Sequence, residues 1–591
     1  MCGIIGVIGN GRAAPTLLKG LEKLDYRGYD SAGMATISDG KIRLKKDVGK
    51  LSEVEEKYHL SHLHGEVGIG HVRWATTGAV TQVNSHPHLD CKGEVAVVHN
   101  GIIENYQEIR ERLKLKHKFI SETDTEVLPH LIEEYMNSGA SLEEAVFQST
   151  KELRGSYALL AIASREPKKI VAACRDEPLV IGLGNNGCNF ITSDPLSFLE
   201  ETNKAIHLGS GETATLTADK ITLFDSQGKE IRKEPEEIQW RWDEATKQGY
   251  DFFMLKEIME QPQAIRRALM QDKNLIMDIA MDILKSRDAI FTACGSSRYA
   301  ALLGRYIFSK LGRKFTDVVM ASEFQYFSDS INRDTLVIAV SQSGETADVL
   351  EGAKAAKKNS ASVVSVVNRV GSLLARMSDK VIYLNCGPEI GVAATKSFTS
   401  QLVIFYLLSS AMANRLDEGW DKIKATSFLI EENLHENGEK LVPIARKISS
   451  KEHCYYIGRG GNLHIAAEGA LKLKEITYIH ADGMPAGELK HGTLALVEKG
   501  TPVVGICPQD YTFYDTMSNI EEAKARGAFV IGVSDRRQDI FDEWIKIPQV
   551  EELLYPLVTV APLQLLAYHT AIARGLDPDK PRNLAKSVTV K

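Results

Sequence analysis

The sequence has few cysteines, no excess of positive charge and no long apolar run, and each shortage excludes a class of protein. Its 591 residues hold 8 cysteines and no CxxC pair, which argues against a disulfide framework and against a cysteine zinc site. The net charge of −7 makes nucleic acid or an anionic membrane an unsuitable main partner. The longest apolar runs, such as LVIFYLL, fall well short of the about 20 residues that cross a bilayer.

The N-terminal segment MCGIIGVIGNG lacks both a basic region and a long hydrophobic region, so we expect no secretion signal and a cytoplasmic protein. Apolar residues make up 43% and charged residues 25% of the chain, which excludes wholesale disorder. A chain of this length predicts about three to five domains.

The first part of the chain, to about residue 235, alternates short β-type runs with helical segments. The runs include CGIIGVIG, EVGIGHVRW, EVAVVHN, SYALLAIAS and KIVAAC, and helical patterns cover 105–114 and 125–136. This alternation predicts a domain in which sheets and helices are mixed. The polar stretch 236–249, which contains two tryptophans, is interpreted as a linker.

The rest of the chain repeats itself at a long period. Three pairs of apolar runs begin about 164–166 residues apart, at 289 and 453, at 335 and 501, and at 362 and 528. Each run is nearly continuously apolar, as expected of a strand that is buried on both faces of a parallel sheet. The repeat predicts two tandem doubly wound α/β domains, joined by a helical segment near 417–447.

Cys2 is a candidate nucleophile because it follows the initiator methionine. Removal of the methionine would leave a free α-amine, whose ordinary pKa of about 7.7–8.0 suits it to act as the base for the thiol of the same residue. The alternative is an incidental cysteine at the start of a buried strand.

Other candidates in this part each have a structural alternative. Asn100 and Gly101 follow an apolar strand and could supply two oxyanion donors, or could simply form a turn. Arg73 could bind a carboxylate or form a structural ion pair. Asp124 would otherwise be a helix N-cap, and Trp74 would be a core aromatic residue.

Together the motifs MCGIIGVIG, LDYRGYDSAG, HVRWATTG, HPH, VVHNGIIENY and SETDTEV resemble the class II glutamine amidotransferases. The resemblance implies an N-terminal-nucleophile hydrolase with an αββα sandwich. It implies Cys2 as nucleophile, Asn100 and Gly101 as the oxyanion hole, and a glutamine site that includes Arg27, Arg73, Trp74, Thr76, Gly78 and Asp124. Thr77 stands where many family members have histidine.

The tandem domains carry polar turns directly after apolar strands. The segment SQSGET, 341–346, precedes a helical pattern, so its hydroxyls and the helix amides could hold a phosphate. Cys294 and the three residues after it close the preceding strand, where ligands bind in open α/β sheets. The alternative for both turns is a simple helix cap.

Three residues of a later helix, Glu468, Lys472 and Glu475, fall on one helical face. They could move a proton next to a carbonyl group, or form an exposed ladder of charges. His491 suits acid–base chemistry but could be structural. Lys586 could form a Schiff base or be a solvated lysine of the C-terminal tail.

The motifs ACGSS, SQSGETADVL, GVAATKSFTSQL, EGALKLKEITYIHA, GELKHGTLALV and DKPRNLAKSVTV resemble sugar isomerase (SIS) domains. Their order after a class II glutaminase resembles the isomerizing glutamine–fructose-6-phosphate aminotransferase family. The resemblance implies catalytic roles for Glu468, Lys472, Glu475, His491 and Lys586. It implies a sugar-phosphate site made of Cys294, Gly295, Ser296, Ser297, Ser341, Gln342, Ser343, Thr346 and Val392. Ala394, Thr493 and Lys591 depart from common family residues.

The expected architecture is α/β: an αββα sandwich at 1–238, a linker at 239–250, SIS domains at 251–435 and 436–575, and a tail at 576–591 that reaches the sugar site. The resemblance implies L-glutamine and D-fructose 6-phosphate as substrates, D-glucosamine 6-phosphate and L-glutamate as products, and a homodimer in which His491 acts on the neighbouring subunit. We expect no metal and no organic cofactor, because acid–base groups suffice for ketose–aldose isomerisation.

Two alternatives stay open. One is a glutaminase coupled to sugar-phosphate isomerisation or deamination without net amination. The other is a sugar-phosphate sensor without catalysis, which would require a DNA-binding module and loss of Glu475, His491 and Lys586.

Overall fold

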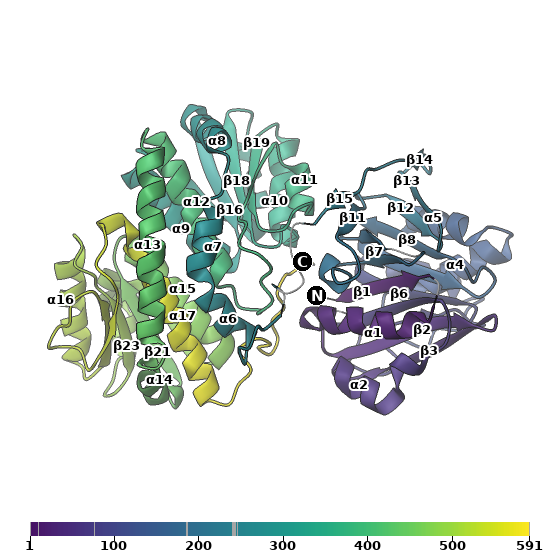
Figure 1. Cartoon of the computed structure of the whole chain (residues 1–591), viewed down its shortest axis with the longest axis horizontal. Coiled ribbons are helices and arrows are strands. Elements are labelled where there is room, and N and C mark those ends of the chain that lie inside the picture. The colour runs from purple at the N-terminus through teal and green to yellow at the C-terminus, as the bar shows by residue number, and fades with distance from the viewer. Residues whose placement is uncertain are drawn as a thin grey trace. The chain divides into compact units, whose positions relative to one another are not determined.

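The computed structural model describes residues 2–9, 11–75, 77–184, 187–238, 244 and 246–589. The chain divides into two compact units, one made of Met1–Asp243 with Ala585–Lys591 and the other of Glu244–Leu584. We call them the N-terminal unit and the C-terminal unit (Figure 1). Half of the expected linker 239–250, namely 239–243 and residue 245, lies outside the described residues.

Two antiparallel sheets form the centre of the N-terminal unit. In the described residues, the first has the order β15(Glu236–Glu237), β11(Lys204–His207), β9(Val180–Leu183), β10(Asn189–Thr192), β1(Gly3–Ile8), β4(Val67–Arg73), β2(Ser31–Ser38) and β3(Lys41–Val48). The second has the order β14(Glu230–Ile231), β13(Ile221–Phe224), β12(Thr213–Leu216), β8(Ile170–Arg175), β7(Gly155–Ala163), β6(Val95–Ile103) and β5(His88–Leu89). The five apolar runs identified in the sequence form β1, β4, β6, β7 and β8.

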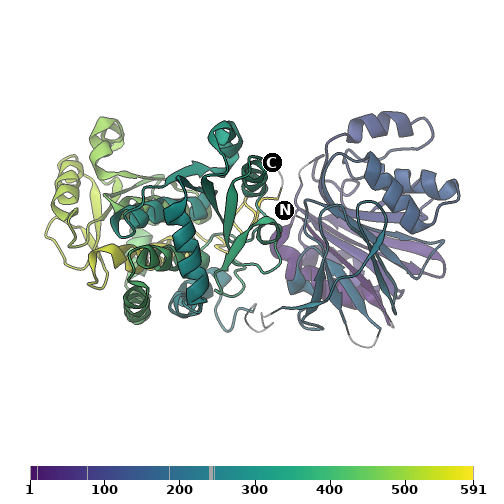
Figure 2. The same ribbon diagram turned by 90° about the horizontal axis from the view of Figure 1, so that it is seen from above.

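Helices cover the outer faces of both sheets. They are α1(Ala13–Leu24) and α2(Leu51–Tyr58) on the first sheet, and α3(Tyr106–Leu113), α4(Val127–Asn137) and α5(Leu142–Glu152) on the second; the 3-10 turns are η1(Asp25–Arg27), η2(Leu60–His62) and η3(Pro195–Ser197). Figures 1 and 2 show α4 and α5 on one side of this unit and α1 on the other.

Side chains alternate between the two faces of each strand, and this alternation explains the four layers of helix, sheet, sheet and helix. In β7, Leu160 and Ile162 join the core between the sheets, whereas Leu159 and Ala161 join the core under α4 and α5. A third cluster lies between the first sheet and α1. Since successive strand residues point to opposite faces, near-continuous apolar runs bury both faces. The expected αββα sandwich is confirmed.

The C-terminal unit contains two parallel sheets with the same strand order. The first has the order β17(Asp317–Met320), β16(Asp288–Ala293), β18(Thr335–Ser341), β19(Ser362–Val367) and β20(Lys380–Tyr383). The second has the order β22(His480–Pro485), β21(His453–Gly458), β23(Pro502–Ile506), β24(Phe529–Ser534) and β25(Glu543–Lys546). Both follow the doubly wound order 2-1-3-4-5, so the predicted duplication is confirmed.

Helices and short 3-10 turns connect these strands. They are α6(Phe253–Met259), α7(Gln261–Ala268), α8(Lys273–Lys285), α9(Gly295–Lys310), η5(Ala321–Ser330), α10(Ala347–Lys358), α11(Leu373–Met377), α12(Lys396–Met412), α13(Leu416–Asn437), α14(Leu441–Ser449), α15(Gly461–Thr477), η6(Ala486–His491), η7(Thr493–Leu496), α16(Phe513–Lys524), η8(Glu552–Leu554) and α17(Tyr555–Ala573). The expected connecting helices near 417–447 are α13 and α14.

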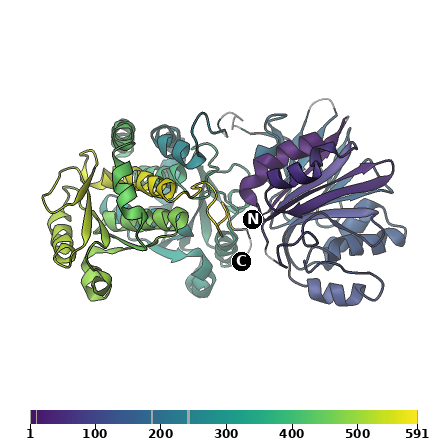
Figure 3. The same ribbon diagram turned by 90° about the horizontal axis from the view of Figure 1, so that it is seen from below.

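The two sheets of the C-terminal unit share one apolar core, which includes residues of α9, α12, α15 and α17. This shared core explains why the two repeats form one compact unit. Figure 3 shows α17, in yellow, among the green helices of this unit. The stretch Glu552–Ala573 is long and apolar enough to cross a membrane, but 83% of its most apolar window is buried inside the protein. This burial is that of a core helix, in agreement with the expectation that the apolar runs of the chain are core-sized.

Candidate functional site

Cys2 lies directly before β1, and its side chain and carbonyl group are both held by distant residues. The Sγ atom accepts a hydrogen bond from the backbone N–H of Trp74 at 3.2 Å. The Cys2 carbonyl oxygen accepts from Asn100 Nδ2 and from Arg27 Nε, each at 3.1 Å. Burial raises the pKa of the thiol, and the Trp74 N–H and the charge of Arg73 only partly oppose it. The thiol therefore needs a base to become a nucleophile.

Arg27 is a buried anchor for this arrangement. Its Nη1 atom lies 3.3 Å from Asp194 Oδ2, and the Tyr26 hydroxyl donates to the same oxygen. Arg27 was expected in the glutamine site, and the structure places its Nε on the backbone of Cys2. Sequence reasoning missed Asp194, whose local pattern signals only that it caps η3.

The two expected oxyanion donors are neighbours on β6. Asn100 is buried, and its Oδ1 atom has no hydrogen-bond partner among the described residues. Gly101 has a φ of +106°, and a Cβ atom there would lie 2.2 Å from the Ser156 carbonyl oxygen. Only glycine fits this close approach, so β6 can present this segment beside Cys2.

A guanidinium and a carboxylate lie near the nucleophile. Arg73 ends β4, donates from Nη2 to the Thr77 carbonyl oxygen at 2.5 Å, and has a buried Nη1 without a hydrogen-bond partner in the described structure. Asp124 accepts from the Ile103 N–H at 2.8 Å. The helix α4 has Glu126 as its N-cap, so the alternative that Asp124 caps this helix is wrong.

The remaining glutamine-site candidates surround this region. The ring of Trp74 packs edge-on against Tyr29 with 5.4 Å between ring centroids. Gly78 has a φ of +81°, which favours glycine. Thr76 lies outside the described residues.

Buried histidines, two of them from the HPH motif, pack close to the residues of this site. His71 Nε2 donates its N–H to the His99 carbonyl oxygen at 3.1 Å. The His71 and His86 rings lie 4.2 Å apart, and the His86 and His88 rings 4.8 Å apart. Burial lowers the pKa of His71 to about 3 and lowers the pKa values of His86, His88 and His99. These rings are therefore neutral near pH 7.

In the C-terminal unit, the segment Ser341–Thr346 forms a tight polar turn between β18 and α10. Ser341 Oγ accepts the N–H of Gly344 at 3.0 Å and lies 3.1 Å from Thr346 Oγ1. Gly344 has a φ of +65°, and a Cβ atom there would lie 2.2 Å from Ser372 Oγ. Since α10 begins at Ala347, the turn gathers hydroxyls at a helix N-terminus, where a phosphate is favoured.

Cys294, the N-cap residue of α9, follows the neighbouring strand β16. The ends of β16 and β18 form the switch point of the sheet, where ligands bind in this fold. Gly295 has a φ of +53°, and Ser297 Oγ accepts from Gln401 Nε2 at 2.9 Å. The sequence candidates Cys294 to Ser297 therefore lie next to the Ser341 turn at the same sheet edge. Gln342 and Val392 contribute backbone contacts, to Asn368 and Asp579.

A buried charge cluster on α15 faces this edge. Lys472 Nζ lies 2.6 Å from Glu475 Oε2 and 3.5 Å from Glu468 Oε1, and Ser296 Oγ donates to Glu468 Oε1 at 2.9 Å. Glu468 and Lys472 have no exposed surface, so the alternative of an exposed charge ladder is wrong.

Burial raises the pKa of Glu468 to about 7. Burial alone would lower the pKa of Lys472, but the two carboxylates outweigh it and raise the pKa. A carboxyl group that titrates near neutral pH beside a buried ammonium is suited to proton transfer.

Two sequence candidates are not brought to this cluster within the C-terminal unit. His491 ends η6 and is exposed. Lys586 is half-buried and falls within the segment grouped with the N-terminal unit.

Known protein families and relatives match both units of the chain. A glutamine amidotransferase domain model matches residues 71–200, and a SIS domain model matches 282–411 and 447–574. Glutamine–fructose-6-phosphate aminotransferases (isomerizing) of Thermococcus kodakarensis and Pyrococcus horikoshii are 48% and 47% identical to this chain, over 100% of both chains in each case. The solved C-terminal domain of glucosamine-fructose-6-phosphate aminotransferase from Francisella tularensis covers 57% of this chain and 100% of its own, with 35% identity and a TM-score of 0.53.

Proposed function

The chain belongs to the isomerizing glutamine–fructose-6-phosphate aminotransferase family, and we propose from this premise how its residues carry out the reaction. The enzyme transfers the amide nitrogen of L-glutamine to D-fructose 6-phosphate and isomerises the product. The products are D-glucosamine 6-phosphate and L-glutamate.

In the first half-reaction, the Cys2 sulfur attacks the side-chain amide carbon of glutamine. The developing oxyanion is stabilised by the Asn100 side-chain amide and the Gly101 N–H. Collapse of this intermediate releases ammonia and leaves a thioester, which water hydrolyses to glutamate. After removal of the initiator methionine, the α-amine of Cys2 takes the thiol proton.

The protein binds glutamine through the charged α-carboxylate and α-ammonium groups of the substrate. The buried Arg73 Nη1 has no hydrogen-bond partner in the described residues, and it suits the α-carboxylate of the substrate. Asp124 suits the α-ammonium group. Trp74, Thr76 and Gly78 complete this site, and Arg27 fixes the backbone of the nucleophile.

In the second half-reaction, Ser341, Gln342, Ser343 and Thr346 bind the sugar phosphate, and Cys294, Gly295, Ser296, Ser297 and Val392 contact the sugar. His491 of a second subunit opens the sugar ring, so the working enzyme is a homodimer. Lys586 forms an imine with the C2 ketone, and ammonia displaces the lysine. Glu475 then moves a proton from C1 to C2, assisted by Lys472 and Glu468.

The observation that favours an enzyme over a sensor is the buried contact of Lys472 with Glu468 and Glu475. Glu468 and Lys472 are fully buried, and burying charged groups costs several kcal/mol unless they are well paired, so their presence is best explained by use in chemistry. Family membership favours net amination over a glutaminase coupled to isomerisation alone.

The direct test is incubation with L-glutamine and D-fructose 6-phosphate, followed by product identification by mass spectrometry. We expect glucosamine 6-phosphate and glutamate in equal amounts. Formation of glucose 6-phosphate and glutamate without an amino sugar would reject the proposal in favour of the coupled glutaminase.

A further inference from the structure

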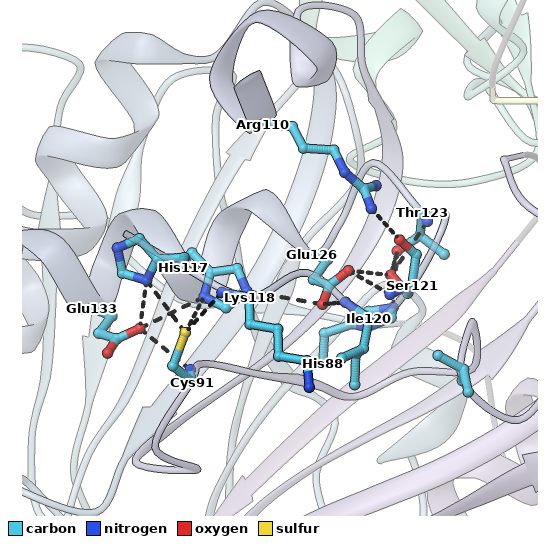
Figure 4. Close-up of polar contacts among 12 residues, drawn as sticks. His88, Cys91, Arg110, His117, Lys118, Ile120, Ser121, Thr123, Glu126 and Glu133 are labelled. Carbon is cyan, nitrogen blue, oxygen red and sulfur yellow. Dashed lines mark hydrogen bonds and ion pairs between the residues drawn. The ribbon is translucent and has the colours of Figure 1, made fainter. Parts of the chain in front are cut away.

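Four side chains with metal-binding atoms converge in the N-terminal unit, and none of them has a part in the proposed chemistry. Cys91, His117, His130 and Glu133 each offer one ligand atom, and these atoms all lie within 4.8 Å of one another. Figure 4 shows three of these residues, Cys91, His117 and Glu133, close together. The two histidines and Glu133 are buried, whereas Cys91 is exposed. An ion could therefore enter from the Cys91 side.

The donors come from three separate segments. Cys91 lies in the turn between β5 and β6, His117 follows α3, and His130 and Glu133 lie on α4. A spacing of three residues puts His130 and Glu133 on the same face of α4. The turn is itself well defined, because Asp90 Oδ1 accepts the N–H groups of Glu94 and Val95 at 2.7 and 2.9 Å.

The donor separations suit a tetrahedral ion. Zinc–ligand bonds of about 2.0–2.3 Å at tetrahedral angles place neighbouring donor atoms about 3.3–3.6 Å apart. Cys91 Sγ lies 3.5 Å from Nδ1 of His117 and 3.7 Å from Nδ1 of His130. Glu133 Oε2 lies 2.9 and 3.6 Å from the same two nitrogens. The shortest of these distances is that of a hydrogen bond, which an ion would replace with a small shift.

The other ring nitrogens face carboxylates. His117 Nε2 lies 3.7 Å from Glu134 Oε1, and His130 Nε2 lies 3.9 Å from Glu126 Oε1. Histidines that bind a metal through one nitrogen commonly offer the N–H of the other to a carboxylate, which fixes the tautomer. Both Nε2 atoms are buried and have no hydrogen-bond partner in the described residues, so a small shift toward these carboxylates would complete the pattern of a metal ligand.

The alternative is a hydrogen-bonded cluster without an ion, and for neutral histidines the tautomers argue against it. A neutral His117 that donates from Nδ1 to Glu133 would present the lone pair of Nε2 to the Glu134 carboxylate. An ion bound at Nδ1 places the proton on Nε2, where Glu134 can accept it. The same reasoning applies to His130 and Glu126.

We propose that Cys91, His117, His130 and Glu133 bind one Zn²⁺ ion as a structural site. One sulfur, two imidazole nitrogens and one carboxylate oxygen are a ligand set that zinc prefers. Because protein atoms fill all four tetrahedral positions, no position is open for catalysis. The expectation of no cysteine zinc site rested on the absence of a CxxC pair. The donors proposed here lie on three separate segments, so no local motif indicates them.

The ion would stabilise a segment that carries a glutamine-site residue. Glu126 accepts the N–H groups of Ile120 and Ser121, each at 2.7 Å (Figure 4). Asp124 lies between these residues and the start of α4 at Val127. Joining α4 to the β5–β6 turn and to His117 therefore fixes both ends of the segment that holds Asp124.

The test uses the full-length protein, with Zn²⁺ as the probe. After metal removal and equilibration with Zn²⁺, we expect elemental analysis to find about one zinc per chain. Cys91→Ser and His130→Ala should reduce this to a small fraction, whereas the control Cys188→Ser should keep it. Glu134→Gln should weaken zinc affinity by about 10–100-fold. Undiminished zinc in Cys91→Ser, or no zinc in the wild type, would overturn the proposal.

A second measurement uses the wild-type protein, so it remains informative if the variants fail to fold. The wild-type protein with Co²⁺ in place of Zn²⁺ should show the intense visible bands of tetrahedral cobalt and a thiolate-to-cobalt charge-transfer band. Cys188→Ser should show the same spectrum. A spectrum without the thiolate band, or with the weak bands of octahedral cobalt, would overturn the proposed ligand set.

Discussion

The side-chain amide of Asn100 donates a hydrogen bond to the backbone carbonyl oxygen of Cys2, over 3.1 Å. The same oxygen accepts from Arg27 Nε, so the nucleophile's backbone is held from two sides. An asparagine amide has two N–H donors. Asn100 can therefore hold Cys2 with one donor and point the other at the oxygen of the substrate amide.

Replacing Asn100 by alanine should lower the glutaminase turnover number by about 10²–10³-fold, because one oxyanion donor is lost. Steady-state release of glutamate measures this. Asn137→Ala, a control on the end of α4, should have wild-type turnover. A loss of less than 10-fold in Asn100→Ala would show that this amide does not stabilise the oxyanion.

Replacing Cys2 by alanine should abolish glutamine-dependent synthesis while sugar isomerisation continues, because the two half-reactions use separate residues. Conversion of fructose 6-phosphate to glucose 6-phosphate measures the second activity, and Cys188→Ala is the matched control. If isomerisation also disappears in Cys2→Ala, the proposed division of labour is wrong.

Replacing Lys586 by alanine should leave glutamine hydrolysis intact but abolish amination, because no imine can form with the ketose. Borohydride trapping of fructose 6-phosphate on the wild-type enzyme should label Lys586 and should fail in the variant. Amination at the wild-type rate in Lys586→Ala would contradict the Schiff-base role.

The buried Glu468 should make the stability of the wild-type protein depend on pH. Burial raises its pKa to about 7, above the ordinary value of about 4.3. Between these values the unfolded chain has lost the proton that the folded chain keeps, so the free energy of unfolding falls as pH rises, by up to about 1.4 kcal/mol per pH unit.

Denaturant unfolding at several pH values tests this slope. Glu468→Gln should flatten it, whereas Glu452→Gln, at an exposed position, should leave it unchanged. A slope that is the same in the wild type and in Glu468→Gln would show that Glu468 does not bind a proton near neutral pH in the folded protein.

The sequence predicted the architecture well because strand and helix patterns are local. The buried strands β16, β18, β21 and β23 are near-continuous apolar runs, and their regular spacing revealed the duplication before any contact was known. The mixed composition of α17 hid its length, since Pro556, Pro562 and Gln564 interrupt the apolar pattern while packing inside the core.

The sites were predicted less evenly, because side-chain partners far apart in sequence leave no local pattern. The pairing of Arg27 with Asp194 and the contact of Ser296 with Glu468 depend on the tertiary fold alone. The four proposed zinc ligands, Cys91 among them, lie in three separate segments of the chain. Glu468, Lys472 and Glu475 were found because helical periodicity places them on one face of a helix. That periodicity does not indicate whether the face is buried, and Glu468 and Lys472 are.

The central claim is that nitrogen released at Cys2 is delivered to the sugar by the same molecule. The most direct measurement is synthesis from glutamine labelled with ¹⁵N in its side-chain amide, in the presence of excess unlabelled ammonium, with mass spectrometry of the amino sugar. We expect nearly all of the glucosamine 6-phosphate to carry the label. Product that carries the unlabelled nitrogen of the buffer, or hexose phosphate without nitrogen, would contradict this claim.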